Sequence, residues 1–269
     1  MGLQIPMREQ SVSNTAEDYL KAVLKIEDRN EKASTSKVAR HLEVNDSTVT
    51  DMLRKLQSAG LLEYTPYYGA TLTPRGRAVA LRILRRHRLI ELFLHQIMGY
   101  GWEQVHEEAE RLEHAVSDFF VERIDALMNY PVQDPHGEVI PDERGFRERE
   151  NDVCLALAEV GDYTIKKVID SSPELLTYLE KESLVPARSF TLLEKAPFRG
   201  PLKLRIHGTH TSSHIGLDVA KRIFVSPCQT QVYSILPSDN PQKGFHAGKR
   251  AKVLTKKPAH KASLKRTRK

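Results

Sequence analysis

Three helical patterns and a hairpin pattern follow one another within residues 14–73, and this order of elements leaves few folds open. Apolar residues recur every three to four positions in NTAEDYLKAVLKIEDRN, STSKVARHL and DSTVTDMLRKLQSAG, as they do on one face of a helix. Two short β-like runs follow, Leu61–Tyr64 and Ala70–Thr73, with Pro66 to Gly69 as the turn between them. Together these elements predict a winged helix-turn-helix.

The ends of these helices carry recognisable signals. Asn14 or Thr15 is the expected N-cap of the first helix, and Asp46 or Ser47 is the expected N-cap of the third. Gly60 is expected to follow the last turn of the third helix, where glycine is common.

In a helix-turn-helix the second helix enters the major groove of DNA, and its N-terminal residues meet base edges. Small hydroxyl side chains there suit a close approach to bases, whereas a carboxylate could accept from a cytosine amino group or lie clear of the groove. The fold can also serve as a mere packing unit, but the hairpin and six arginines between Arg75 and Arg88 favour DNA. The predicted DNA contacts are Thr15, Ser36, Asn45, Ser47, Thr48 and Asp51, with Arg54 and Lys55 nearer to phosphates.

The rest of the chain changes from helical to strand-like periodicity. Helical patterns run over residues 75–98, 102–120 and 121–129, and a stretch rich in Pro, Gly and acids follows. Short strand-like runs beyond residue 151, interrupted by one helical segment at 172–184, suggest a small barrel. The fold class is therefore mainly α with a small β domain. The expected domains are 1–74 (winged helix-turn-helix), 75–140 (helical), 141–150 (linker), 151–226 (barrel) and 227–269 (a basic tail without fixed structure).

Charge and cysteine content limit the setting in which the chain works. Residues 243–269 hold 11 Lys/Arg and no Asp/Glu. The net charge of the whole chain is +6, so residues 1–242 have a net charge of 6 − 11 = −5. That tail could be a nucleic-acid arm or a solubilising extension. Two lone cysteines, Cys154 and Cys228, argue for a reducing compartment, and no apolar run is long enough to span a membrane. Without a secretory signal, a cytoplasmic protein is expected.

The stretch HEEAERLEH, residues 106–114, is unusually rich in histidine and glutamate. On a continuous helix, His106, Glu110, Glu113 and His114 would lie within an arc of about 100°. An earlier stretch, RRHRLIELF, places a second histidine and glutamate four residues apart on one face. Two such helices could form a cage for a divalent metal ion, although a solvated acidic face would look the same in sequence.

The combined motifs resemble the diphtheria-toxin-repressor family of metal-dependent transcriptional regulators, in its three-domain form. The motifs are EDYLKAVLKIE, VARHLEVNDSTVTDMLRKLQSAGLLEY, LTPRGRAVA, RRHRLIELFL, VHEEAERLEHAVSD and DPHGEVIP, followed by PELLTYLEKESLVP, APFRGPLKLRI and IGLDVAKRIFV. The resemblance covers residues 12–226. It implies that the middle helices mediate dimerisation, that residues 151–226 form an SH3-like (FeoA-like) domain, and that the protein is not an enzyme.

The resemblance also implies two metal sites. The primary site would use Asp18, Glu110, Glu113 and His114, and the second would use His87, Glu91 and His106. The barrel could add a ligand, with Glu174 as the nearest acidic candidate. Carboxylates in place of sulfur ligands favour Mn²⁺, with Fe²⁺ as the alternative.

One position departs from the manganese-type pattern. Those members with two adjacent metal ions carry a glutamate three residues after the aspartate, where this chain has Lys21. A protonated lysine cannot ligate and would repel a second cation. Two separated sites are therefore expected rather than a bridged pair.

The expected function is a metal-activated repressor that binds operator DNA as a homodimer and controls metal-homeostasis genes. Asp18 would be the switch ligand, because a bound metal would pin the first helix to the middle helices and set the spacing of the two recognition helices at about 34 Å. The dimer seam could use Leu92, Phe93, Ile97, Phe119 and Phe120, although each could equally be core.

Three other functions stay open from the residues alone. A winged-helix regulator could respond to an organic ligand, a metallohydrolase could use the His/Glu cage, and a structural nucleic-acid binder could rely on the basic tail. His207, His210 and His214 are expected to be loop residues rather than ligands, since their spacing fits neither helix nor strand ligation.

Overall fold

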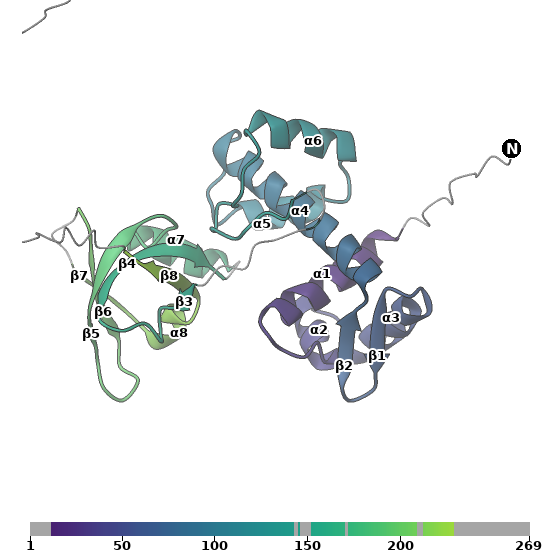
Figure 1. The fold of residues 1–269 in the computed structure, drawn as a ribbon, viewed down its shortest axis with the longest axis horizontal. Coiled ribbons are helices and arrows are strands. Elements are labelled where there is room, and N and C mark those ends of the chain that lie inside the picture. The colour runs from purple at the N-terminus through teal and green to yellow at the C-terminus, as the bar shows by residue number, and fades with distance from the viewer. Residues whose placement is uncertain (1–11, 143–144, 146–151, 170–171, 209–211, 229–269) are drawn as a thin grey trace, which may run out of the picture. The chain divides into compact units, whose positions relative to one another are not determined.

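The computed structural model describes residues 12–142, 145, 152–169, 172–208 and 212–228. Three hydrophobic cores lie in these residues. The first belongs to the N-terminal helices and hairpin, the second mainly to the C-terminal sheet, and the third to the middle helices. The element order of the expected fold class, helices first and a small sheet domain last, is confirmed (Figure 1).

The N-terminal part is a winged helix-turn-helix. Its helices are α1 (Asn14–Asp28), α2 (Thr35–Leu42) and α3 (Asp46–Ser58), and its hairpin consists of β1 (Leu62–Thr65) and β2 (Gly69–Leu72). The two strands pair antiparallel, with Leu62 opposite Leu72 and Thr65 opposite Gly69. Apolar side chains at helical spacing on α1 form the centre of this core, because both α2 and the later helix α4 (Pro74–Gln96) pack against α1.

The predicted N-caps were each misplaced by at least one residue. Ser13 caps α1 by accepting a hydrogen bond from the Ala16 amide, so the cap is neither Asn14 nor Thr15. Asn45 occupies the N-cap position of α3, ahead of Asp46 and Ser47. A hydroxyl in extended backbone can cap wherever it precedes the first turn, so the sequence alone offered several equivalent candidates.

The middle part contains α4 (Pro74–Gln96), α5 (Val105–Leu112) and α6 (Asp118–Leu127). The expected helix over residues 102–120 was wrong, because the chain leaves the helix after Leu112 and restarts at Asp118. Ser117 caps the new helix by accepting from the Phe120 amide. The break matters for function, since Glu113 and His114 lie in the turn rather than on α5.

The C-terminal part is a six-stranded antiparallel sheet in the order β3-β8-β4-β5-β6-β7. Two of its strands and one short helix were not predicted: β3, β7 and α8, all of which are too short for a clear periodic signal. Register shifts interrupt β4 against β8 and β5 against β6, and such irregularities bend a sheet around its core. The elements are β3 (Val153–Cys154), β4 (Gly161–Val168), α7 (Pro173–Lys181), β5 (Ser189–Lys195), β6 (Leu202–Ile206), β7 (Ser212–Ile215), α8 (Leu217–Ala220) and β8 (Ile223–Pro227).

Four of the six arginines of α4 form ion pairs within the protein, whereas the sequence led us to expect that the cluster faces DNA. Arg85 pairs with Asp125, Arg86 with Asp118, and Arg88 with both Asp134 and Glu138. Arg77 pairs with Glu27 of α1. These guanidinium groups cross-link the helices and the loop after α6, because buried or half-buried arginines need acidic partners. The cluster therefore gives little support for DNA binding.

No helix in the described part of the chain combines the length and apolar character that crossing a bilayer demands. The basic residues from Lys243 onward lie outside the described residues.

Candidate metal centre

The helix α4 presents His87 and Glu91 one turn apart, as their spacing predicts. Nε2 of His87 lies 2.9 Å from Oε1 of Glu91, and Nδ1 of His106, from α5, lies 2.9 Å from the same oxygen. The two imidazoles meet edge-on, with 3.1 Å between Nε2 of His87 and Nδ1 of His106. The structure thus brings together the three residues expected in the second site.

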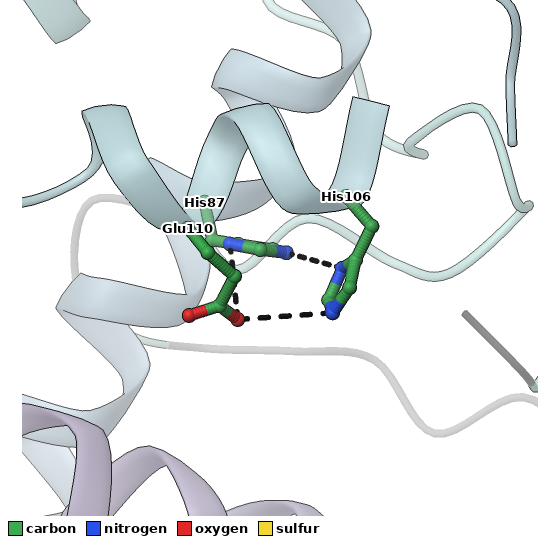
Figure 2. A group of neighbouring side chains, drawn as sticks. All are labelled: His87, His106 and Glu110. Atoms are coloured by element: carbon green, nitrogen blue, oxygen red, sulfur yellow. Dashed lines mark hydrogen bonds and ion pairs between the residues drawn. The ribbon is translucent and has the colours of Figure 1, made fainter. Parts of the chain in front are cut away.

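Glu110 faces these imidazoles. Its Oε1 lies 3.8 Å from Nδ1 of His87 and 3.8 Å from Nε2 of His106. Figure 2 shows the three side chains converging, with His87 from α4 and the other two from α5. One ligand atom from each lies within 4.8 Å of the others, so a single ion could contact all three.

A second group joins α1, the first helix of the winged helix-turn-helix, to the turn after α5. Oδ1 of Asp18 lies 2.7 Å from Nε2 of His114, which is itself 3.3 Å from Oε1 of Glu113. Ligand atoms of these three residues also lie within 4.8 Å of one another. The expected primary set is therefore divided, because Asp18, Glu113 and His114 gather in one place while Glu110 turns toward His87 and His106.

Glu17 is a contributor that the sequence reasoning missed. Its Oε2 lies 3.2 Å from Nδ1 of His114, and the residue is only 8% exposed. This contact fixes the ring so that Nε2 faces Asp18. Carboxylates that orient a histidine in this way raise its basicity and hold the ring in position. The only sequence signal was the position of Glu17 directly before Asp18.

Lys21 lies between the two groups. Its Nζ is 2.9 and 3.0 Å from the two carboxylate oxygens of Glu110 and 2.5 Å from Oε1 of Glu113. Burial lowers the pKa of the Lys21 ammonium, but attraction to Glu113 and Glu110 outweighs this, so the pKa is raised. The lysine stays charged, as the sequence reasoning assumed.

A third group was not predicted. Glu91, Asp134 and His136 are all buried, and one ligand atom from each lies within 4.8 Å of the others. Asp134 and His136 belong to the loop after α6, where Oδ1 of Asp134 accepts from the amides of His136 and Glu138. The motif DPHGEVIP carried this signal, but a loop has no periodicity from which its contacts could be inferred.

Charges control the protonation of these groups. Both ring nitrogens of His87 face carboxylates; burial lowers its pKa, but attraction to Glu91 and hydrogen bonds to Glu113 and Glu91 raise it above the usual 6.5. His106 differs, since burial outweighs its bond to Glu91 and lowers its pKa. Burial would raise the pKa of Glu110, but Lys21 and His87 lower it to about 2.

Two aspartates have raised pKa values, in contrast to the lowered pKa of Glu110. Burial raises the pKa of Asp18 despite its bond to His114. Burial and repulsion from Glu91 raise the pKa of Asp134 to about 7, although Arg88 opposes the shift. Since a metal ligand must be deprotonated, metal binding would release protons here.

The donor set fits a divalent first-row metal ion. Each group mixes carboxylate oxygen with imidazole nitrogen, a combination that suits manganese, iron and zinc. Glu113 is fully buried, and an ionised carboxylate at such depth needs a cation or several donors beside it. The side chains present in the three groups are therefore suitable ligands for such a metal ion.

The predicted DNA contacts form an exposed surface on the helix-turn-helix. Residues at the start and along the outer side of α3 are exposed, while Val49, Leu53 and Leu56 are buried beneath them. A recognition helix needs such an arrangement, with one face packed on the domain and the other free to enter the DNA groove. All eight predicted contacts are exposed: Thr15, Ser36, Asn45, Ser47, Thr48, Asp51, Arg54 and Lys55.

The candidate dimer-seam residues divide into two classes. Leu92 is buried within the middle core, so the core alternative holds for it. Ile97, Phe119 and Phe120 are 53%, 71% and 41% exposed, and Phe93 packs edge-on against Phe120 at 6.2 Å between centroids. Large exposed apolar side chains close together usually mark an interaction surface.

The remaining candidates lie apart from the three groups. Glu174, in the first turn of α7, bonds to Ser172 and joins none of them. Glu107 and Glu108 pair with Arg111 near the surface, as expected of solvated acids. His207 lies in a turn, but His214 lies in β7 rather than a loop, and His210 is outside the described residues.

Comparison with known families finds a match for each of the three parts between residues 11 and 227. Residues 11–70 match the family described as "Iron dependent repressor, N-terminal DNA binding domain", and residues 73–142 match "Iron dependent repressor, metal binding and dimerisation domain". Residues 153–227 match the "FeoA domain".

Individual relatives agree with these matches. An HTH-type transcriptional regulator of Methanocaldococcus jannaschii is 39% identical over 118 residues, which are 44% of this chain and 94% of that protein. The iron-dependent repressor IdeR of Mycobacterium leprae is 34% identical over 128 residues, 48% of this chain but only 56% of that protein. A solved structure described as "Manganese-dependent transcriptional repressor complex with manganese" is 35% identical, with a TM-score of 0.72, and the match covers 79% of this chain and all of that one.

Proposed function

The chain belongs to the diphtheria-toxin-repressor family of metal-dependent transcriptional repressors, and we propose that a bound divalent metal ion, for which manganese is favoured, controls its binding to DNA. The observation that carries the proposal is the contact between Asp18 and His114, 2.7 Å between Oδ1 and Nε2. One residue belongs to α1, in the DNA-binding domain, and the other to the turn after α5. A ligand set that spans two domains couples metal occupancy to their relative position.

We propose Asp18, Glu113 and His114 as the primary metal ligands. Glu17 orients the ring of His114, and Glu113 reaches both sites because its Oε2 lies 2.8 Å from Nδ1 of His87. A bound divalent ion would supply the positive charge that holds these side chains together. These ligands would hold α1 in one position against the middle helices. The orientation of α3 would then be fixed as well, because α3 belongs to the same domain as α1.

The second site is proposed to use His87, Glu91 and His106, with Glu110 as a further ligand. Glu91 is shared with Asp134 and His136, so the loop after α6 could complete or replace this set. The neutral form of His106, favoured by its lowered pKa, has a lone pair available for a metal ion.

Manganese is favoured by ligand chemistry. None of the proposed ligands is sulfur, and carboxylate oxygen suits harder ions such as Mn²⁺. The similar solved structure is described as a manganese complex, whereas the mycobacterial relative is named for iron. Fe²⁺ therefore stays the alternative.

The proposed target is a palindromic operator bound by a homodimer. The exposed face of α3 supplies base and phosphate contacts, and the apolar residues Ile97, Phe119 and Phe120 supply the seam between two copies. Regulated genes are proposed to serve metal homeostasis. Because DNA is the target, we propose the cytoplasm as the place of action.

The other functions that the sequence leaves open would each need an additional assumption. Membership in a metal-dependent family accounts for the His/Glu groups, so no organic effector is needed. The relatives are transcriptional regulators, and we propose no enzymatic activity.

The test is operator binding at controlled free concentrations of Mn²⁺, Fe²⁺, Co²⁺ and Zn²⁺. The operator is first selected from random duplex DNA with the manganese-loaded full chain. We expect Mn²⁺ to raise operator affinity at lower free concentration than Fe²⁺. Activation by Fe²⁺ at lower concentration would reverse the choice of metal, and activation by no metal would refute the proposed function.

A further inference from the structure

Lys21 contacts two proposed metal ligands, yet the proposed function gives it no role. Its ammonium bonds both oxygens of Glu110 and one oxygen of Glu113, and its side chain is 4% exposed. Glu113 is fully buried. A buried ammonium held by two carboxylates is a fixed positive charge inside the metal centre.

The contacts of Lys21 join the same segments as the proposed primary site. Lys21 lies one turn along α1 from Asp18, and its partners lie on α5 and in the turn after it. Asp18 reaches His114 in that same turn. Helix α1 of the DNA-binding domain is therefore attached to the metal-binding domain twice, once through the lysine and once through residues that would share a metal ion.

The two attachments compete for one atom. Oε1 of Glu113 lies 2.5 Å from Nζ of Lys21 and 3.3 Å from Nε2 of His114. An ion that used this oxygen would lie close to the ammonium, and like charges a few ångströms apart repel strongly in a buried site. The ammonium also holds both oxygens of Glu110, which keeps that carboxylate away from Asp18.

Building on the proposed function, we propose that Lys21 is a positioning residue, an internal cation that fastens α1 to the metal-binding domain in the absence of metal. It also weakens metal binding at Asp18, Glu113 and His114. The metal ion then strengthens an attachment that already exists. Two consequences follow: the metal-free protein retains part of its operator affinity, and activation requires a higher free metal concentration than the ligands alone would set.

A merely structural ion pair would behave differently. Removing a buried partner destabilises the fold, which would lower metal affinity together with every other property. An internal cation has effects of opposite sign: without Lys21, attachment of α1 in metal-free protein weakens, while metal binds more tightly because the repulsion has gone.

The experiment compares wild-type full chain with Lys21→Gln and Lys21→Met. Glutamine keeps hydrogen-bonding groups without the charge, so it guards against misfolding in the methionine variant. Lys181→Gln is the control, because it removes the charge of an exposed lysine in the last turn of α7 that belongs to none of the three groups. Three quantities are measured: amide hydrogen exchange of α1 in chelator, Mn²⁺ affinity without DNA, and affinity for the selected operator with and without Mn²⁺.

Both Lys21 variants are expected to exchange α1 amides faster in chelator and to lose roughly tenfold in metal-free operator affinity. Their Mn²⁺ affinity should rise by roughly tenfold or more, with operator affinity in saturating Mn²⁺ close to wild type. Lys181→Gln should leave each quantity close to its wild-type value.

Unchanged α1 exchange in both variants, or Mn²⁺ affinity that falls together with operator affinity, would overturn the proposal. Wild-type protein without any specific metal-free operator binding would overturn it as well. Failure of Mn²⁺ to activate wild-type protein is a separate result that refutes the proposed function, because the exchange and metal-affinity measurements judge Lys21 without DNA.

Discussion

Glu113 shows how much one residue can connect at this centre. One carboxylate oxygen is shared by Lys21 and His114, and the other bonds His87. Its burial leaves no solvent to replace a lost partner, so each contact is costly to remove. Ligands of both proposed sites are thereby linked through a single side chain.

Glu17→Gln tests whether the carboxylate that orients His114 matters. An amide would hold the ring less strongly and would not raise its basicity, so Mn²⁺ affinity should fall about 10- to 100-fold, with the fold retained. Metal titration by competition with a fluorescent chelator measures this. Glu107→Gln, on the exposed side of α5, is the control and should leave the affinity unchanged. Equal affinities for the two variants would argue against the orienting role.

Asp134→Asn tests the buried carboxyl group whose pKa lies at about 7 instead of the usual 3.8. The folded state holds this proton more tightly than the unfolded state, so the stability from Asp134 is lost as pH rises from about 4 to 7. Asparagine does not titrate. In chelator, the free energy of unfolding of the variant, measured by denaturant titration, should therefore rise relative to wild type between pH 5 and pH 8, by on the order of a few kcal/mol at most. A difference that stays constant with pH would contradict the assigned shift.

At the scale of elements, periodic segments were predictable and breaks were not. The helices α1, α3 and α4 follow apolar spacing, and the hairpin was placed within one residue, because buried faces impose a period on the sequence. The end of α5 at Leu112 was missed, since EHAVS continues a helix-compatible composition past the last turn. The same break explains why Glu113 and His114 reach toward α1.

The site itself was predictable only in part. His87 and Glu91 lie in contact, as their four-residue spacing predicts, and the family resemblance contributed Asp18 to the proposed ligands. The orientation of Glu110 toward His87 and His106 could not be foreseen, because it depends on Lys21 of α1 contacting Glu110 of α5 and Glu113 of the turn after it. Glu17 and Asp134 were missed for the same reason: contacts across elements leave no periodic trace in sequence.

Gly76→Ala probes how the hairpin joins α4. A Cβ at Gly76 would lie 1.7 Å from the backbone carbonyl oxygen of Leu61, and backbone cannot move aside as a flexible side chain can. The free energy of unfolding should fall by about 1–3 kcal/mol, as measured by denaturant titration. Gly216→Ala is the matched control, because a Cβ there has open space. Similar stability of both variants would contradict the tight contact.

At the scale of the whole molecule, the proposed dimer depends on the exposed apolar residues at the end of α4 and on α6. Phe119→Glu places a charge in this surface, so light scattering should show a monomer in place of a dimer. Operator affinity should fall by at least about tenfold, because two half-sites must be engaged together. Leu127→Glu tests whether the seam extends along α6, where that residue is 63% exposed. A Phe119→Glu variant that remained dimeric would place the seam elsewhere.

The central claim is that metal occupancy acts on DNA binding through Asp18, the proposed ligand on α1 of the DNA-binding domain. The most direct measurement is operator affinity of Asp18→Ala and wild type across a Mn²⁺ titration, with Glu107→Ala as the control. We predict that Mn²⁺ raises wild-type and control affinity by roughly 5- to 150-fold and leaves Asp18→Ala near its metal-free value. Full manganese activation of Asp18→Ala would contradict the account.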